Sequence, residues 1–132
     1  MESKNRCYTY FYMTGDIDPK MVSEWLGLGA LHYDNGRSSS WDFGLCDEYD
    51  VYTTRQMEKT IAPLLSKIDE LNAIREATGA KFYLAVVPTI YTDDIHPVLA
   101  PSLAVMDFCH ATRTEIDMDL YIIEGDDEDE EE

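Results

Sequence analysis

Two carboxylates and a phenol stand at alternate positions near the end of the chain. Asp117, Asp119 and Tyr121 alternate with apolar residues between Ile116 and Ile122, which is typical of a strand with one face in water. Residues two apart on a strand share a face, so the three polar groups should line up. Paired carboxylates accept charge-assisted hydrogen bonds from Arg or Lys, which makes this face a candidate site for a basic partner.

Two other interpretations of the same acids stay open. A pair of carboxylates can supply two oxygen ligands to a hard cation such as Ca²⁺ or Mg²⁺. Alternatively the acids belong to a solvated sheet face, or pair internally with Lys4, Arg6 or Arg113.

Tyrosines alternate in the same way near the start of the chain. Tyr8, Tyr10 and Tyr12 share one face of a strand predicted over residues 7–13. Tyrosine is enriched at protein interfaces, so this stripe is a second candidate contact surface, adjacent to the acids if the first and last strands pair. The alternative is that the rings pack under a helix or a loop. Of the two tryptophans, Trp25 is expected in the core, whereas Trp41 is expected to be partly exposed and joins the candidate contact residues.

Motifs for catalysis are lacking. His32, His96 and His110 have no metal-ligand spacing, and a polar loop explains Asp93-Asp94 near His96 better than a metal site does. Nothing local marks Cys46 as a nucleophile, and GxSxG and phosphate-binding glycine motifs are missing. We therefore predict no catalytic residue, metal or cofactor, although residues distant in sequence can converge into an active site.

Charge is the most unusual global property. The segment 124–132 holds eight acidic residues, and removing these eight from the formal net charge of −17 leaves −9 for residues 1–123. Such a field repels nucleic acid and anionic membrane surfaces and attracts basic proteins. The expected partner is therefore a basic protein, either a toxin or a nucleic-acid-binding protein, and the oligomeric state stays open. The tail, if disordered, could also act only to maintain solubility.

The cysteines and apolar segments bear on the compartment. Cys7, Cys46 and Cys109 are odd in number and widely spaced, which favours three reduced thiols, at least two of them buried. No apolar stretch approaches the ~20 residues of a membrane span, and no apolar core follows the basic N-terminal residues. These features predict a cytoplasmic protein.

Helix signals are clearest at three places. Asp18 should cap a helix that begins at Pro19 and ends at Gly27, with a stripe formed by Met21, Val22, Trp25, Leu26 and Leu28. A longer helix is predicted over 53–78, with a capping box at Thr53 and Gln56 and a bend, or a second start, at Pro63. A third helix over 102–112 should pack through Leu103, Met106 and Cys109.

Five strands complete the prediction. They span residues 7–13, 30–33, 40–45, 81–87 and 116–123, with an Asn35-Gly36 turn joining the second and third and an irregular loop over 88–97. The order β-α-β-β-α-β-α-β predicts a single α+β domain over 1–124, with a mainly antiparallel sheet, helices on one face, and a disordered acidic tail over 125–132.

In their order, these segments resemble a bacterial family of uncharacterised domains, domain-of-unknown-function family 4279. The resemblance is carried by Thr14-Gly15-Asp16, Trp25-Leu26-Gly27-Leu28, Asn35-Gly36-Arg37 with Trp41, Leu64-Leu65-Ser66-Lys67-Ile68, and the strand 116–121. The chain departs from the family pattern by lacking a proline soon after Leu28 and by its acidic tail. Because some members look like immunity proteins encoded beside toxins, the resemblance implies binding and supplies no catalytic residues.

Charge and resemblance together predict an acidic inhibitor or immunity-type protein that neutralises a basic, nuclease-like toxin. Its candidate contact residues are Asp117, Asp119, Tyr121, Tyr8, Tyr10, Tyr12 and Trp41. The alternatives are a nucleic-acid mimic acting on a defence system, a small metal-binding protein or enzyme, and a constitutive subunit of a larger assembly.

Overall fold

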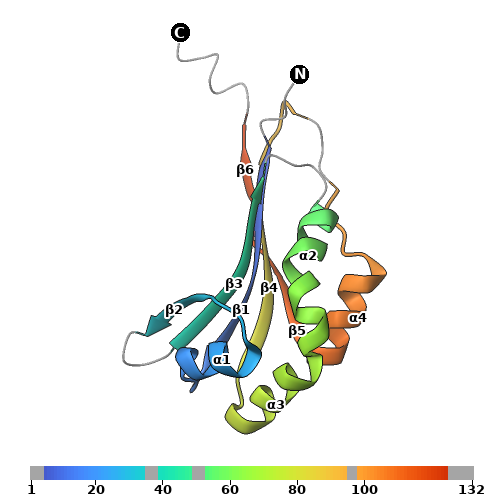
Figure 1. Ribbon diagram of the computed structural model, residues 1–132. Coiled ribbons are helices and arrows are strands. Elements are labelled where there is room, and N and C mark those ends of the chain that lie inside the picture. Colours follow the sequence, from blue (N-terminus) through green and yellow to red (C-terminus); the bar gives the residue numbers. More distant parts are fainter. Residues whose placement is uncertain (1–4, 35–38, 49–52, 95–97, 125–132) are drawn as a thin grey trace.

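The predicted α+β fold with helices on one face of a mainly antiparallel sheet is confirmed (Figure 1). The computed structural model describes residues 5–34, 39–48, 53–94 and 98–124. In chain order the elements are β1 (Arg6–Gly15), α1 (Pro19–Leu26), β2 (Leu31–Asp34), β3 (Ser39–Glu48), α2 (Thr53–Ile61), the 3₁₀ helix η1 (Ala62–Lys67), α3 (Ile68–Thr78), β4 (Lys81–Tyr91), α4 (Leu103–Thr112), β5 (Thr114–Met118) and β6 (Tyr121–Ile123).

β1 is the strand around which the sheet is ordered. The strands follow the order β2-β3-β1-β4-β5, and β6 continues alongside β4 beyond the end of β5. β1 pairs antiparallel with both β3 and β4, whereas β5 and β6 run parallel to β4. β2 and β3 form the predicted antiparallel pair. β4 is interior, as expected, so the first and last strands do not pair directly.

The hydrophobic core lies between the sheet and the helices. In Figure 1 the sheet is seen nearly edge-on, with α2, α3 and α4 together on one side of it. Alternate residues of β1 point into this layer, where Phe11 makes edge-on ring contacts with Trp41 and Phe108. The same face of β4 contributes Phe82, Leu84 and Val86, all buried.

The first helix begins and ends as predicted. The Asp18 carboxylate accepts a hydrogen bond from the backbone N–H of Lys20 at 3.1 Å, and Pro19 occupies the first turn. Gly27 ends the helix in the left-handed conformation, at φ +70°. The prediction that Trp25 lies in the core is wrong, because its side chain is 41% exposed and Val22 and Leu26 supply the buried side of this short helix.

The long predicted helix is divided at its proline. α2 ends at Ile61, Pro63 lies in a 3₁₀ turn, and α3 resumes at Ile68, because a proline in a helix interior has no N–H to donate. The predicted capping box is wrong. The Thr53 hydroxyl donates to the carbonyl of Val98, and the Gln56 amide is buried against β1. A buried amide must be hydrogen-bonded, and its partners here are on the sheet.

The predicted loop after residue 87 is partly wrong, since β4 continues through Pro88 to Tyr91. Proline within a strand lacks one ladder N–H. The carbonyl of Val86 accepts from Asp119 on the β5 side, so position 88, two residues on, faces the same side. That side lies at the break between β5, which ends opposite Val86, and β6, which begins opposite Thr89. No ladder hydrogen bond is needed there.

Two predicted apolar faces are also wrong. The last strand is interrupted at residues 119–120, and Met118, Leu120 and Ile122 are 39%, 43% and 61% exposed. Ile116 alone of that series packs against the core. In α4, Leu103 and Met106 are exposed, and the buried side is formed instead by Val105, Phe108, Cys109 and Thr112.

Several predictions lie outside the described residues: the disordered tail over 125–132, the turn at Asn35-Gly36, and His96. Within the described part of the chain, no helix is both long enough and apolar enough to cross a membrane. Cys7 and Cys109 are buried and form no disulfide, as predicted for at least two of the three cysteines.

Two glycines provide a test of how β3 packs on α2. Gly44 has φ +74°, and a Cβ there would lie 3.2 Å from both the side chain and the carbonyl oxygen of Thr60. Gly27 has nearly the same φ but open space around it. Gly27→Ala should therefore cost only the left-handed conformation, about 1 kcal/mol, whereas Gly44→Ala should cost clearly more. Urea unfolding of both variants measures the difference, and equal losses would contradict this packing.

Candidate functional site

The sheet face opposite the helices carries most of the predicted contact residues. Tyr8, Tyr10 and Tyr12 point to this side of β1, because the intervening residues of β1 are buried under the helices. Their partners on β4 are Val87, Ala85 and Tyr83. The tyrosine stripe is therefore not packed under a helix of the described chain.

The rings form a continuous series. Tyr8 and Tyr10 are stacked with centroids 6.2 Å apart, and the Tyr10 and Tyr12 centroids are 5.6 Å apart. Tyr83 extends the series onto β4, with its ring stacked on Tyr12 at 4.8 Å. Offset-stacked aromatic rings hold one another in fixed orientations. The result is a continuous aromatic surface with four hydroxyl groups.

Carboxylates flank the rings on both sides. On the β3 side, Asp42 is the register partner of Tyr12. On the other side, the Tyr12 hydroxyl donates to Asp117 of β5 at 3.2 Å, so the Tyr12 side chain crosses β4. The Tyr121 hydroxyl donates to Asp119 at 3.1 Å. We call the set Tyr8, Tyr10, Tyr12, Tyr83, Tyr121, Asp42, Asp117 and Asp119 the tyrosine–acid face.

A neighbouring acid on β3 is already neutralised. Arg6 donates to both carboxylate oxygens of Asp47, through Nε at 2.8 Å and Nη2 at 2.5 Å. This pairing lowers the pKa of Asp47. By contrast, Asp42, Asp117 and Asp119 form no ion pair with any described residue. The predicted internal pairing with Arg6 or Arg113 is therefore not seen, and Lys4 lies outside the described residues.

The electrostatic field over the rings is negative. Partial burial raises the pKa of Tyr12 to about 12, with further contributions from the charge of Asp117 and its hydrogen bond. Burial also raises the pKa of Tyr10, as do the charges of Asp42, Asp117 and Asp119. For Tyr121 the main cause of a raised pKa is its hydrogen bond to Asp119. Each shift disfavours phenolate formation, so the hydroxyls remain donors at neutral pH.

The structure brings together six of the seven predicted contact residues. The exception is Trp41, for which the prediction of partial exposure is wrong. Trp41 is fully buried on the opposite side of the sheet, where its indole N–H donates to the Ser23 hydroxyl at 2.8 Å. Its register partner Met13 belongs to the helix-facing side of β1. The sequence alone does not reveal that Trp41 is buried, because the face on which it lies depends on the register of β3 with β1.

Sequence reasoning missed Tyr83 and Asp42. Residues 81–87 were interpreted as apolar on both faces, which concealed that Tyr83 alternates with the buried Phe82 and Leu84. Asp42 lies between Trp41 and Phe43, and this alternation is the signal that could have identified it as facing away from the core.

Among the described residues, no cluster of three or more His, Cys, Asp or Glu side chains is placed to hold a metal ion. Asp94 instead accepts a hydrogen bond from the backbone N–H of Asn5 at 3.1 Å.

Comparison with protein-family models, with curated proteins and with solved structures found no match. The resemblance to family 4279 therefore remains a prediction.

The carboxylate of Asp117 should control the titration of Tyr12. Asp117→Asn removes the charge and the ionic hydrogen bond, so the Tyr12 pKa should fall from about 12 but remain above the ordinary value of 10, because burial persists. In the wild type, the raised pKa also means that stability decreases as pH rises from about 10 to 12, since the unfolded chain loses its proton first. NMR titration of the tyrosine Cζ resonances measures the Tyr12 pKa in the wild type and the variant. An unchanged Tyr12 pKa in Asp117→Asn would refute the coupling.

Proposed function

We propose that this chain is a protein-binding inhibitor domain of the immunity type, and that its tyrosine–acid face binds a basic partner protein. The observation that carries the proposal is the series of four tyrosine rings in mutual contact, flanked by acids that lack a basic partner among the described residues. Tyr8 and Tyr121 are 37% and 52% exposed, so part of this surface is accessible.

The chemistry of the face suits arginine and lysine. A guanidinium group stacks on an aromatic ring and at the same time donates to a carboxylate in its plane. Asp117 lies within hydrogen-bond distance of the Tyr12 hydroxyl, so ring and carboxylate are in reach of one cationic side chain. Stacked rings also lose little conformational freedom on binding, which favours affinity.

Long-range electrostatics supports the same partner. The formal net charge of −17 accelerates encounters with a basic protein by roughly 10–1000-fold at low salt. It also repels the phosphate groups of nucleic acid. A basic effector whose cationic surface normally holds nucleic acid would be blocked by this face, which agrees with the immunity role that the resemblance to family 4279 implies.

The proposed compartment is the cytoplasm. Cys7 and Cys109 are buried and form no disulfide, and burial raises the pKa of Cys109 to about 11, which keeps it protonated and unreactive. Three cysteines that form no disulfide suit a reducing compartment, where a toxin would be neutralised before it reaches its target.

Binding to a basic probe should depend on the acids of this face. Asp117→Asn combined with Asp119→Asn should weaken binding of an arginine-rich peptide about three- to tenfold, since each exposed charge pair contributes ~0.2–1 kcal/mol. Binding of the wild type should also weaken as salt rises. NMR titration of the full chain gives both the affinity and the contact residues, which should lie on the tyrosine–acid face.

The matched control is Asp69→Asn with Asp107→Asn, which removes the same charge from exposed positions on α3 and α4. If this control weakened binding equally, the net charge alone would act and the face would have no special role. The two double variants also serve as baits in native lysate. A single basic protein retained by wild type and control, but lost from the Asp117 and Asp119 variant, would identify the partner.

A further inference from the structure

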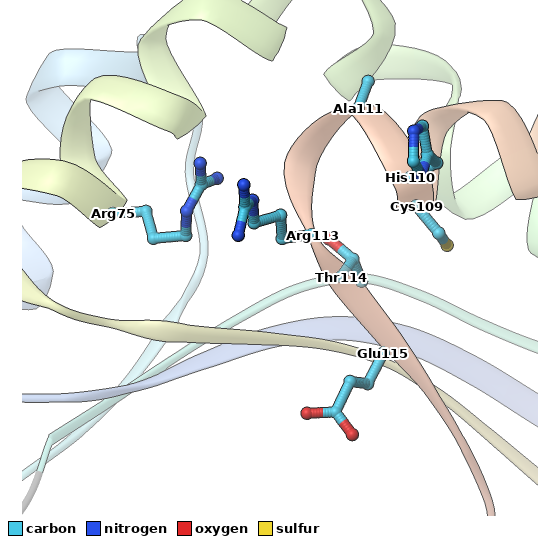
Figure 2. Close-up of a pocket in the computed structure, with 7 residues that line it drawn as sticks. All are labelled: Arg75, Cys109, His110, Ala111, Arg113, Thr114 and Glu115. Carbon is cyan, nitrogen blue, oxygen red and sulfur yellow. The ribbon is translucent and has the colours of Figure 1, made fainter.

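A second surface of the molecule is basic, which is unusual for so acidic a chain. A pocket of about 760 Å³ lies where α4 turns into β5, lined by Arg75, Cys109, His110, Ala111, Arg113, Thr114 and Glu115 (Figure 2). Pockets that bind small molecules have volumes of ~300–1,000 Å³. This pocket is separate from the tyrosine–acid face in all its lining residues.

Arg75 is held in place by the end of α4. Its Nη1 donates to the Thr112 carbonyl at 2.9 Å and to the Asn72 side chain. Asn72 in turn donates to the Ala111 carbonyl at 3.1 Å. The remaining Nε and Nη2 hydrogens of Arg75 have no partner in the described part of the chain. The guanidinium is therefore fixed, with donor groups left over.

Arg113 occupies a position that normally belongs to glycine. It ends α4 with φ +56°, whereas Gly27 and Gly79 hold the same position at the ends of α1 and α3. A left-handed conformation is unfavourable for a residue with a Cβ, so an arginine here costs folding stability, and a functional role of its side chain would explain why it stands there. Arg113 makes its cap through its backbone N–H, which involves no part of the guanidinium.

The two guanidinium groups point toward one another in Figure 2, while the carboxylate of Glu115 points away from both. Neither arginine forms an ion pair with a described residue, although the chain has 27 acidic residues for 10 lysines and arginines. Two guanidinium groups that line one pocket, and that have no ion pair among the described residues, can be neutralised there by an anion from outside.

We infer that this pocket binds a small molecule bearing an oxyanion, either a phosphate or a carboxylate group. The leftover donors of Arg75 and the guanidinium of Arg113 supply paired N–H groups of the geometry that such oxygens accept. His110, in the last turn of α4, lines the same pocket and adds a further polar group. The site is distinct from the proposed partner surface and does not depend on it.

The test titrates the full chain with inorganic phosphate, with citrate, and with sodium chloride at matched ionic strength. We expect saturable shifts of the Arg75 and Arg113 Nε–H resonances, and of amides 110–115, with phosphate, citrate or both. Which of the two saturates tells a phosphate ligand from a carboxylate ligand. Shifts equal to those in chloride, or saturation elsewhere on the molecule, would overturn the inference.

Variants separate the site from a role in folding. Arg113→Gly removes the guanidinium and relieves the backbone, so it should raise the melting temperature and yet weaken anion binding about tenfold or more. Arg113→Gln should weaken binding similarly, while Arg55→Gln on α2 removes an equal charge outside the pocket and should leave binding intact. Equal affinity in the Arg113 and Arg55 variants would refute the site, as would a folded Arg113→Gly protein with full affinity.

Discussion

The alternation of side chains along β1 is the constraint on which the rest of the structure depends. Because β1 lies between β3 and β4, every residue of this strand must face either the helices or the opposite side of the sheet. Phe11 and Met13 are fully buried with the helices, so Tyr10 and Tyr12 must lie on the other side. A shift of one residue in register would place the tyrosines in the core. Core and candidate site are therefore specified by the same strand.

A buried polar contact holds this register. The Gln56 amide donates to the Cys7 carbonyl at 2.8 Å and its oxygen accepts from the Thr9 hydroxyl at 3.1 Å, so α2 is fixed against one position along β1. Thr60 repeats the contact one helical turn later by donating to Gly44 on β3. Misaligned strands would leave these groups buried without partners, at a cost of ~1–3 kcal/mol each. Buried polar contacts between α2 and the sheet thus stabilise the register that places the tyrosines on the opposite face.

The sequence predicted what depends on local pattern and failed where pairing between distant segments decides. Asp18, Pro19 and Gly27 identified the first helix, because capping is a property of neighbouring residues. Alternation placed Tyr8, Tyr10 and Tyr12 on one face, but only the register shows that this face is opposite the helices. Trp25 was predicted in the core and is exposed, whereas Trp41 was predicted to be partly exposed and is buried, because contacts between distant segments decide both positions. The contact of Tyr12 with Asp117 spans 105 positions in the chain and crosses a strand, so no local pattern could predict it.

Apart from the Arg6–Asp47 pair, the charges that line the two candidate sites are largely segregated by sign. Asp42, Asp117 and Asp119 lie on the sheet face, and Arg75 and Arg113 lie at the corner between α4 and β5. Glu115 and Arg113 are only two residues apart, yet the strand sends Glu115 to the side of Tyr83 while the left-handed turn at Arg113 directs that side chain toward Arg75. The backbone conformation of one residue therefore keeps apart two charges that an extended chain would place on a common face. This separation leaves a negative surface and a basic pocket apart from one another within a single small domain.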